Sequence, residues 1–212
     1  MNQWDMNNDI ERVLYSQADI AEAAERVGKQ LAADYEGRTP IILSVLKGAV
    51  LWTVDVMRHM QYAEVEFIDV SSYNGGVASS GQVDLVTDLQ TDIAGRDIII
   101  MEDIVDTGRS LKFMIELLLE RGAKSVKVAS LLDKKDGRVV EAEVDYIGFD
   151  VPKAFVVGYG LDYKQLYRNL PYVGVLKREV YDPAHAPRFA RNGAISHSSV
   201  SIDLLFTSVR TP

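Results

Sequence analysis

The chain of 212 residues contains no cysteine, which excludes a disulfide framework, thiolate zinc or iron–sulfur sites and a cysteine nucleophile. The lack of cysteine fits a reducing compartment, so we expect a cytoplasmic protein. No run of about 18 apolar residues occurs, and the polar, acidic first residues do not resemble a signal peptide. We therefore predict neither a transmembrane segment nor a membrane partner.

Basic residues are fewer than acidic ones. Lys and Arg together number 23 and Asp and Glu 31, which gives a net charge of −8. A chain this acidic lacks the basic surface that nucleic-acid binding requires, so we predict no nucleic-acid partner. Any anionic substrate must be held by local groups, since the overall field opposes it. Zinc-protease, serine-hydrolase and Walker-type nucleotide-binding motifs are also missing.

Strand-like and helix-like segments alternate along the chain. Apolar or alternating runs predict strands at residues 40–46, 64–72, 83–88, 97–101, 125–132 and 154–158, and helical periodicity predicts helices at 16–36, 49–60 and 109–121. Ser16 and Asp19 form a capping box at the start of the first helix. The alternation predicts an α/β fold, a mostly parallel central sheet flanked by helices. In such a sheet ligands bind beyond the carboxyl ends of the strands.

The last 31 residues differ in composition from the rest. Residues 182–212 contain three of the six prolines and neither lysine nor glutamate. We expect one domain over residues 1–181 and a tail of uncertain order over 182–212. An appended or poorly ordered segment is the simpler interpretation, and a lid or an oligomerisation arm is the alternative.

The stretch IIIMEDIVDTGRSL at residues 98–111 is the most informative. An apolar strand leads into the adjacent acids Glu102 and Asp103, Asp106 follows, and a glycine-containing turn opens a helix. Backbone N–H groups at a helix N-terminus favour a phosphate. Carboxylates beside them accept hydrogen bonds from sugar hydroxyls, directly or through a hard cation. Acids also end strands and cap helices for structural reasons, but this combination favours a binding site for a phosphorylated sugar.

This stretch resembles the motif by which phosphoribosyltransferases bind phosphoribosyl pyrophosphate (PRPP). Other segments extend the resemblance: Leu46-Lys47-Gly48, Ser71-Ser72-Tyr73, Leu131-Leu132-Asp133-Lys134, the run from Phe155 to Tyr163, and Arg168. Together they resemble the hypoxanthine(-guanine) phosphoribosyltransferases of the short bacterial type over about residues 10–180. The resemblance implies a type I phosphoribosyltransferase fold with a small hood and a flexible catalytic loop. It also implies transfer of the phosphoribosyl group from PRPP to hypoxanthine and/or guanine, with Mg²⁺ as cofactor, in a homodimer or homotetramer.

The resemblance also implies roles for individual residues. Asp106 is the expected general base, because the purine must lose a ring proton as it attacks the sugar. The expected PRPP contacts are Glu102, Asp103, Asp106, Thr107, Gly108, Arg109 and Ser110; the pyrophosphate contacts Lys47, Gly48 and Arg168; the purine contacts Lys134, Phe155, Val156 and Asp162; the catalytic-loop residues Ser72 and Tyr73; and the metal-site residues Glu102, Asp103 and Asp162. An ammonium only donates hydrogen bonds, so Lys134 suits a 6-oxo group and disfavours a 6-amino group. In the family, the peptide between the residues matching Leu46 and Lys47 can be cis.

Four alternatives remain at this point. A xanthine-preferring or an orotate enzyme would use much the same motif. A PRPP-sensing regulator of the same fold would need a basic face or a further DNA-binding domain, against the net charge of −8. A receiver domain also clusters acids at strand ends, but Lys47-Gly48 and the segment from Phe155 to Asp162 would have no role there.

Overall fold

The computed structural model describes residues 5–72, 83–182 and 184. The chain divides into two compact units, residues 1–177 and 178–212. The first unit holds both β-sheets. The described part of the second unit consists mainly of the short helix α4 (Arg178–Tyr181). The Arg178 Nε donates a hydrogen bond at 3.1 Å to the carboxylate of Asp182, the residue that follows this helix. The predicted division after residue 181 stays a prediction.

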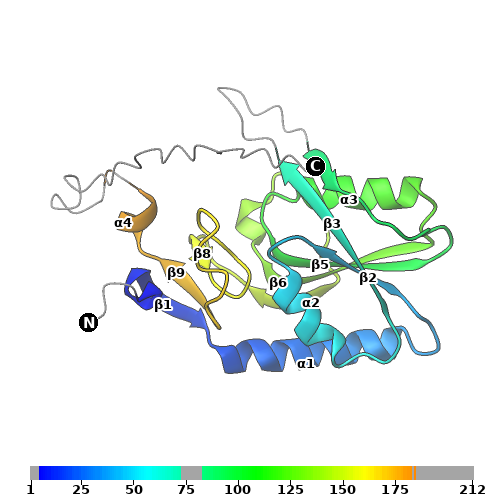
Figure 1. Ribbon diagram of the computed structural model, residues 1–212, viewed down its shortest axis with the longest axis horizontal. Helices are drawn as coiled ribbons and strands as arrows, with labels where there is room; N and C mark the ends of the chain where they lie inside the picture. The colour runs from blue at the N-terminus through cyan, green and yellow to red at the C-terminus, as the bar shows by residue number, and fades with distance from the viewer. Residues whose placement is uncertain (1–4, 73–82, 183, 185–212) are drawn as a thin grey trace, which may run out of the picture. The chain divides into compact units, whose positions relative to one another are not determined.

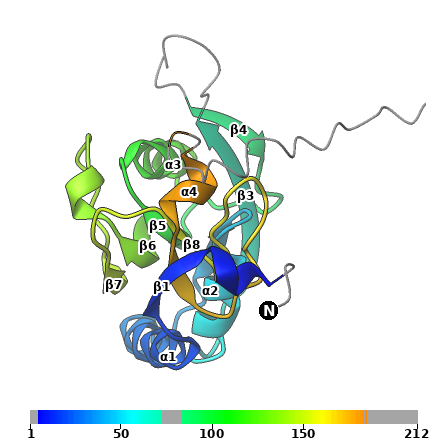
Figure 2. The ribbon, with the colours of Figure 1, turned by 90° about the vertical axis from the view of Figure 1, so that its left-hand side faces the viewer.

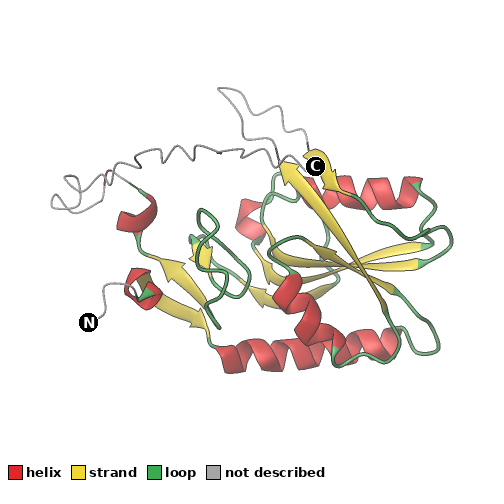
Figure 3. Cartoon of the chain, viewed as in Figure 1, coloured by secondary structure: helices red, strands yellow, loops and turns green. Residues whose placement is uncertain are grey.

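A six-stranded sheet forms the centre of the first unit (Figures 1 and 3), with the strand order β4-β3-β2-β5-β6-β7. The strands are β2 (Ile41–Val45), β3 (Glu64–Ser72), β4 (Val83–Thr87), β5 (Asp97–Val105), β6 (Ser125–Asp133) and β7 (Tyr146–Asp150). All neighbouring strands run parallel except β3 and β4. The predicted mostly parallel sheet is confirmed.

Helices cover both faces of this sheet (Figure 2). The helices α1 (Gln17–Asp34) and α2 (Val50–Met57) lie on one face, and α3 (Arg109–Glu120) lies on the other. The central strands β2 and β5 are consequently buried on both sides, with Ile41–Leu43 and Ile98–Met101 wholly inaccessible to solvent. This burial explains why both strands are continuous apolar runs rather than alternating ones. No helix in the described residues is both long and apolar enough to span a bilayer.

The predicted capping box at the start of α1 is confirmed. Ser16 Oγ accepts a hydrogen bond from the Asp19 N–H at 3.2 Å, and the Asp19 carboxylate accepts one from the Ser16 N–H at 2.8 Å. These two bonds satisfy backbone donors that have no partner inside the helix.

Removing this cap should destabilise the protein measurably. We expect Ser16→Ala to lower the free energy of unfolding by about 1 kcal/mol, because the first turn of α1 loses a hydrogen-bond acceptor. Urea denaturation at constant protein concentration measures the change. Gln30→Ala, on the exposed face of the same helix, is the matched control and should leave the midpoint nearly unchanged. Equal midpoints for Ser16→Ala and the parent would contradict this role.

A second, antiparallel sheet of three strands has the order β1-β9-β8. Its strands are β1 (Ile10–Tyr15), β8 (Val156–Val157) and β9 (Val173–Leu176). It matches the small hood that the resemblance implies. The sequence pattern missed β7 of the central sheet. In the hood it predicted only the segment around β8 and missed β1 and β9. These strands are short, and β1 exposes Val13 to 50%, so they lack a clear apolar period and depend on partners far along the chain.

The observed end of β5 differs from the predicted one, and the difference affects the acidic residues. The strand predicted at 97–101 continues to Val105, because β6 pairs with it as far as Val105 and Asp133. Glu102 and Asp103 therefore lie within β5 rather than in the loop beyond it. The predicted strand at 154–158 contracts to Val156–Val157. Ser72 is the last residue of β3, whereas Tyr73, the other residue expected in the catalytic loop, lies outside the described residues.

Candidate active site

The candidate site lies at the carboxyl ends of the three neighbouring strands β2, β5 and β6 (Figure 1). The loop after β2 contains Lys47 and Gly48, the turn after β5 contains Asp106, and the loop after β6 begins at Lys134. Because the three strands are parallel neighbours, their ends meet at one edge of the sheet, where ligands of such folds bind.

Two adjacent carboxyl groups form the floor of the site. Glu102 is 7% exposed and Asp103 is half-buried. Burial, and secondarily the neighbouring Asp103, raises the pKa of Glu102 well above its usual range. Burial also raises the pKa of Asp103 to about 6, although the Ile104 N–H donates to its carboxylate at 2.8 Å and opposes the shift. The pair thus holds its negative charge only at a cost that a nearby cation would remove.

The turn from Asp106 to Ser110 leads into α3. Gly108 is its N-cap residue and has a φ of +82°, a conformation that favours glycine. A Cβ at Gly108 would also lie 3.0 Å from the side chains of Ala142 and Arg138. A small cavity of about 130 Å³ opens here, lined by Glu102, Ile104, Val105, Asp106, Thr107, Gly108, Ser110 and Leu111. The helix start faces this cavity with backbone N–H groups that suit an anion.

Asp106 and Lys134 form an ion pair across the site. The Lys134 Nζ lies 2.8 Å from the Asp106 Oδ2, and the lysine side chain is only 16% exposed. Sequence reasoning gave these residues separate roles, one toward the ring proton and the other toward the 6-oxo group, and did not foresee their contact. Before any substrate binds, Asp106 and Lys134 are therefore already charged partners of each other.

Gly48 fits tightly between two other parts of the site. The Leu46–Lys47 peptide before it is cis. A Cβ at Gly48 would lie 1.7 Å from the Asp103 Oδ2, and a Cβ at Gly160 would lie 1.9 Å from the Gly48 carbonyl oxygen. Only glycines permit this close approach of the loop after β2 to the acidic strand and to the turn after β8. Lys47 is exposed beside them.

Arg168 and Asp162 form a second charged pair close to Asp103. The Arg168 Nη2 lies 2.6 Å from the Asp162 Oδ1, and Nη1 donates to the Gly160 carbonyl at 2.7 Å. The charge of Arg168 lowers the pKa of Asp103 and that of Asp162 raises it, so both residues lie within electrostatic reach of Asp103. The Arg168 Nε is buried without a hydrogen-bond partner.

The remaining predicted residues that the structure describes lie at or beside β8 of the hood, at the start of α3 and at the end of β3. Phe155 is 39% exposed, and its ring meets the Tyr163 ring edge-on at 5.6 Å between centroids. Val156 is buried in β8 and pairs with Val175 of β9. Arg109 is exposed on the first turn of α3. The structure does not describe the side chain of Ser72 or any part of Tyr73, so it does not connect either residue to the site.

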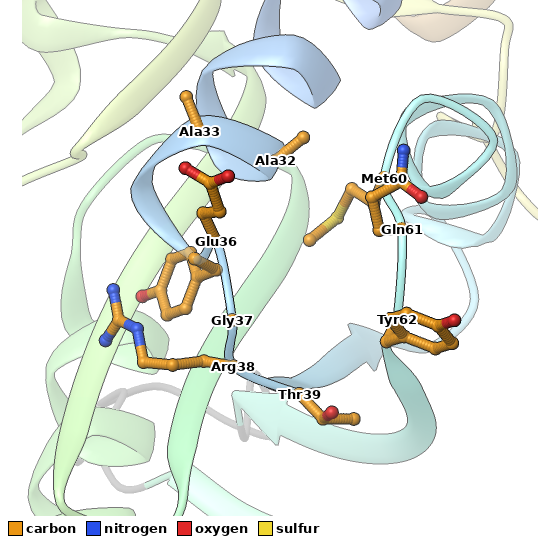
Figure 4. A pocket seen from close by; sticks show the side chains of 10 residues that line it. Ala32, Ala33, Glu36, Gly37, Arg38, Thr39, Met60, Gln61 and Tyr62 are labelled. Atoms are coloured by element: carbon orange, nitrogen blue, oxygen red, sulfur yellow. The ribbon is translucent and has the colours of Figure 1, made fainter.

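A larger cavity lies elsewhere, between the end of α1 and residues 60–62 (Figure 4). Its volume is about 690 Å³, and its lining includes Tyr35, Arg38, Met60 and Tyr62. It opens near the amino end of β2, opposite the edge where the acidic residues gather. Parallel sheets bind ligands at the other edge, so volume alone does not make this cavity the functional site.

Sequence reasoning missed two residues next to the acidic turn, Gly137 and Arg138. A Cβ at Gly137 would lie 1.7 Å from the Asp106 Oδ1, and Arg138 donates to the backbone on both sides of Asp106. Both residues follow the end of β6 at Asp133 in a stretch that contains no motif by which the pattern could have found them. Only the return of this loop onto the end of β5 brings them to the site.

The geometry defines a class of site: an acidic pair at a strand end, of which Glu102 is buried and Asp103 half-buried, followed by a turn at a helix N-terminus that suits a phosphate. Residues 11–164 match the family model for the phosphoribosyl transferase domain, and the chain belongs to this family. The fold and the arrangement of the acidic motif agree with that membership.

Individual phosphoribosyltransferases are also similar to this chain. The chain is 49% identical to a hypoxanthine-guanine phosphoribosyltransferase of Streptococcus agalactiae over 177 residues, which are 83% of this chain and 98% of that protein. It is 50% identical over 177 residues to the bifunctional protein TilS/HprT of Listeria monocytogenes, but these residues span only 27% of that relative's length. Among solved structures, a hypoxanthine phosphoribosyltransferase of Staphylococcus aureus superposes with a TM-score of 0.81 at 42% identity, covering 85% of this chain and 99% of that one.

Proposed function

We propose that this chain is a purine salvage enzyme that transfers the 5-phosphoribosyl group from PRPP to hypoxanthine and guanine, giving IMP, GMP and pyrophosphate. The observation that supports this most directly is the Asp106–Lys134 pair at 2.8 Å, set beside the acidic pair and the start of α3. A proton acceptor and a donor suited to a 6-oxo group thus lie together next to a place for a sugar phosphate. The relatives named hypoxanthine-guanine phosphoribosyltransferase and hypoxanthine phosphoribosyltransferase support the choice of a 6-oxopurine.

In this proposal, the turn after β5 holds the sugar phosphate. The backbone N–H groups from Thr107 to Ser110 and the hydroxyls of Thr107 and Ser110 would bind its 5-phosphate, with help from the partial positive charge at the start of α3. The Glu102 and Asp103 carboxylates would accept hydrogen bonds from the ribose hydroxyls. Asp106 would take the ring proton of the purine as the ring nitrogen attacks the sugar.

The acidic pair also fits a magnesium ion. In the described residues, no three His, Cys, Asp or Glu side chains gather closely enough to hold a metal by themselves. Magnesium commonly binds proteins through one or two carboxylates, with waters and substrate phosphates completing its shell. Glu102 and Asp103, whose pKa values burial raises, would gain from such a cation, and Asp162 lies within electrostatic reach of Asp103. A bound Mg²⁺ would neutralise charge on the pyrophosphate leaving group.

The pyrophosphate itself would lie against the loop after β2. Lys47 is exposed there, and Gly48 lets this loop lie against the Asp103 carboxylate, so that the pyrophosphate would lie close to the acidic pair. Arg168 would add its guanidinium, since its buried Nε has no partner within the protein and its side chain is held at Gly160 and Asp162. A buried donor without a partner is uncommon and is consistent with a ligand-binding role.

The purine would stack on Phe155, whose ring is partly exposed, while the backbone of Val156 would meet the edge of the base. Lys134 would donate to the 6-oxo group. Adenine presents a 6-amino donor at the same place, and two donors facing each other in a half-buried site disfavour binding strongly. The proposal therefore includes discrimination against adenine.

Several wider expectations belong to the same proposal. We infer a homodimer or homotetramer, substrates limited to small molecules, a cytoplasmic location and a catalytic loop that includes Ser72 and Tyr73. A xanthine-preferring enzyme of the same fold is the nearest alternative. The long β5 with an acidic pair inside it, and the family match, leave no support for a receiver domain.

A base-panel assay tests the proposed function. Purified protein, PRPP and Mg²⁺ are mixed with hypoxanthine, guanine, xanthine or adenine, and nucleotide formation is followed by absorbance. Product from hypoxanthine and guanine but not from adenine is the expected result. A clear preference for xanthine would favour the alternative enzyme, and no product from any base, with PRPP still bound, would favour the PRPP-sensing regulator.

The contribution of Lys134 can be measured separately. We expect Lys134→Gln to raise the KM for hypoxanthine about tenfold or more, since it removes a charged hydrogen-bond donor, while the affinity for PRPP changes much less. Steady-state kinetics with each substrate varied in turn gives both values. Lys135→Gln, on the neighbouring and exposed lysine, is the matched control. An unchanged KM for hypoxanthine would remove Lys134 from base recognition.

A further inference from the structure

Arg138 holds the backbone on both sides of Asp106. Its Nη1 donates to the carbonyl oxygens of Val105 at 2.8 Å and of Asp106 at 2.9 Å. The first carbonyl belongs to the peptide group before the Asp106 Cα and the second to the peptide group after it. One guanidinium therefore fixes both peptide planes that set the direction of the Asp106 side chain.

The guanidinium is itself held firmly. Its Nη2 pairs with the carboxylate of Asp133, whose side chain is 3% exposed, and the Arg138 side chain is 16% exposed. Because an arginine is planar and offers several donors in a fixed fork, it can serve a carboxylate and two carbonyls at once. A lysine has a single ammonium and cannot reach three acceptors in the same geometry. The arrangement therefore depends on the shape of the side chain as well as on its charge.

The neighbouring backbone packs on the same turn. A Cβ at Gly137 would lie 1.7 Å from the Asp106 Oδ1, so this residue leaves the carboxylate no room to move in that direction. The Val139 N–H donates to the Thr107 carbonyl at 3.0 Å. Residues 137–139 thus close over one side of the turn, with Arg138 at their centre.

We propose that Arg138 is a positioning residue for phosphoribosyl transfer, which aims the Asp106 carboxylate at the ring proton of the purine. This inference rests on the proposed function, in which Asp106 is the general base. A general base must lie within hydrogen-bond distance of the proton that it removes, and a displacement of about 1 Å can reduce the rate about 100-fold. Arg138 prevents such a displacement by tying the turn to the buried Asp133.

Two variants of the full-length chain test the assignment. We expect Arg138→Ala to lower kcat about 10- to 100-fold with a smaller change in the KM for PRPP, because the base is misplaced while the phosphate turn remains. Adding millimolar guanidinium should restore part of the lost kcat, because the ion can occupy the space that the side chain leaves. Arg138→Lys keeps the charge beside Asp133 but loses the fork, so its kcat should stay well below that of the parent. Arg121→Ala removes an arginine paired with Asp88 at the far end of α3 and is the matched control.

A readout without turnover separates this inference from the proposed function. Amide hydrogen exchange of the free protein should speed up at residues 105–110 in Arg138→Ala, with little change in α1. Faster exchange with a lower, guanidinium-responsive kcat supports the assignment. A parental kcat in Arg138→Ala or in Arg138→Lys, or unchanged exchange at 105–110, overturns it. If the parent forms no nucleotide from any base, the proposed function fails, whereas the exchange result still decides whether Arg138 holds the turn.

Discussion

Replacing Asp106 with asparagine should lower kcat for nucleotide formation by about 10²- to 10⁴-fold, the range that a positioned general base contributes. The amide has nearly the same shape as the carboxylate, but it cannot accept the ring proton at neutral pH. It also loses the charged contact with the Lys134 Nζ, now at 2.8 Å. PRPP should still bind, because the backbone N–H groups of the turn and the acidic pair remain in place.

Single-turnover kinetics and calorimetric titration with PRPP measure the two effects separately. Asp136→Asn makes the same chemical change at an exposed position of the neighbouring loop and should retain the parental rate. Near-parental turnover in Asp106→Asn would remove Asp106 from proton transfer. Loss of PRPP binding together with turnover would instead assign Asp106 to the binding of the sugar phosphate.

Replacing Asp103 with asparagine should have opposite effects on stability and on activity. The neutral amide no longer favours a cation or the water bound to it, so we expect the apparent affinity for PRPP and Mg²⁺ to fall about 10- to 100-fold. The protein without ligand should become more stable near neutral pH, because a carboxylate that is costly to charge has been removed. Charged groups in binding sites typically lower the stability of the protein without its ligand in this way.

The pH dependence gives the sign of the stability effect. The pKa of Asp103 is about 6 in the folded protein, raised by burial from the ordinary value of 3.8. Between these values the folded state binds more protons than the unfolded state, so the stability contributed by this group is present at low pH and is lost as pH rises through about 6. The stabilisation by Asp103→Asn should therefore be larger at about pH 8 than at about pH 5.5, by about 0.5–1 kcal/mol.

Urea denaturation of the parent and the variant at the two pH values measures this difference. Glu120→Gln, at the exposed end of α3, removes a carboxylate that solvent screens and should show little pH-dependent gain. A gain that is equal at both pH values, or a destabilised variant at the higher one, would contradict the assigned cost of charging Asp103.

Local sequence determined much of the fold and of the site. The apolar runs of β2 and β5, the helical period of α1 and the capping box at Ser16 depend on neighbours within a few residues, so they can be read from the chain itself. The acidic stretch at Glu102–Ser110 was likewise visible, because its chemistry and spacing are contiguous. The resemblance to phosphoribosyltransferases added the hood and the expected roles of residues farther along the chain.

Only the tertiary structure decided which of these groups touch. The contact of Lys134 with Asp106, the close approach of Gly160 to Gly48, and the hold of Arg138 on the turn after β5 join residues that are distant in the chain. The hood strands β1 and β9 likewise form because each pairs with the other rather than because either has a strong pattern of its own. Local periodicity specifies which face of an element is apolar, whereas contacts between loops depend on how the whole sheet brings their strand ends together.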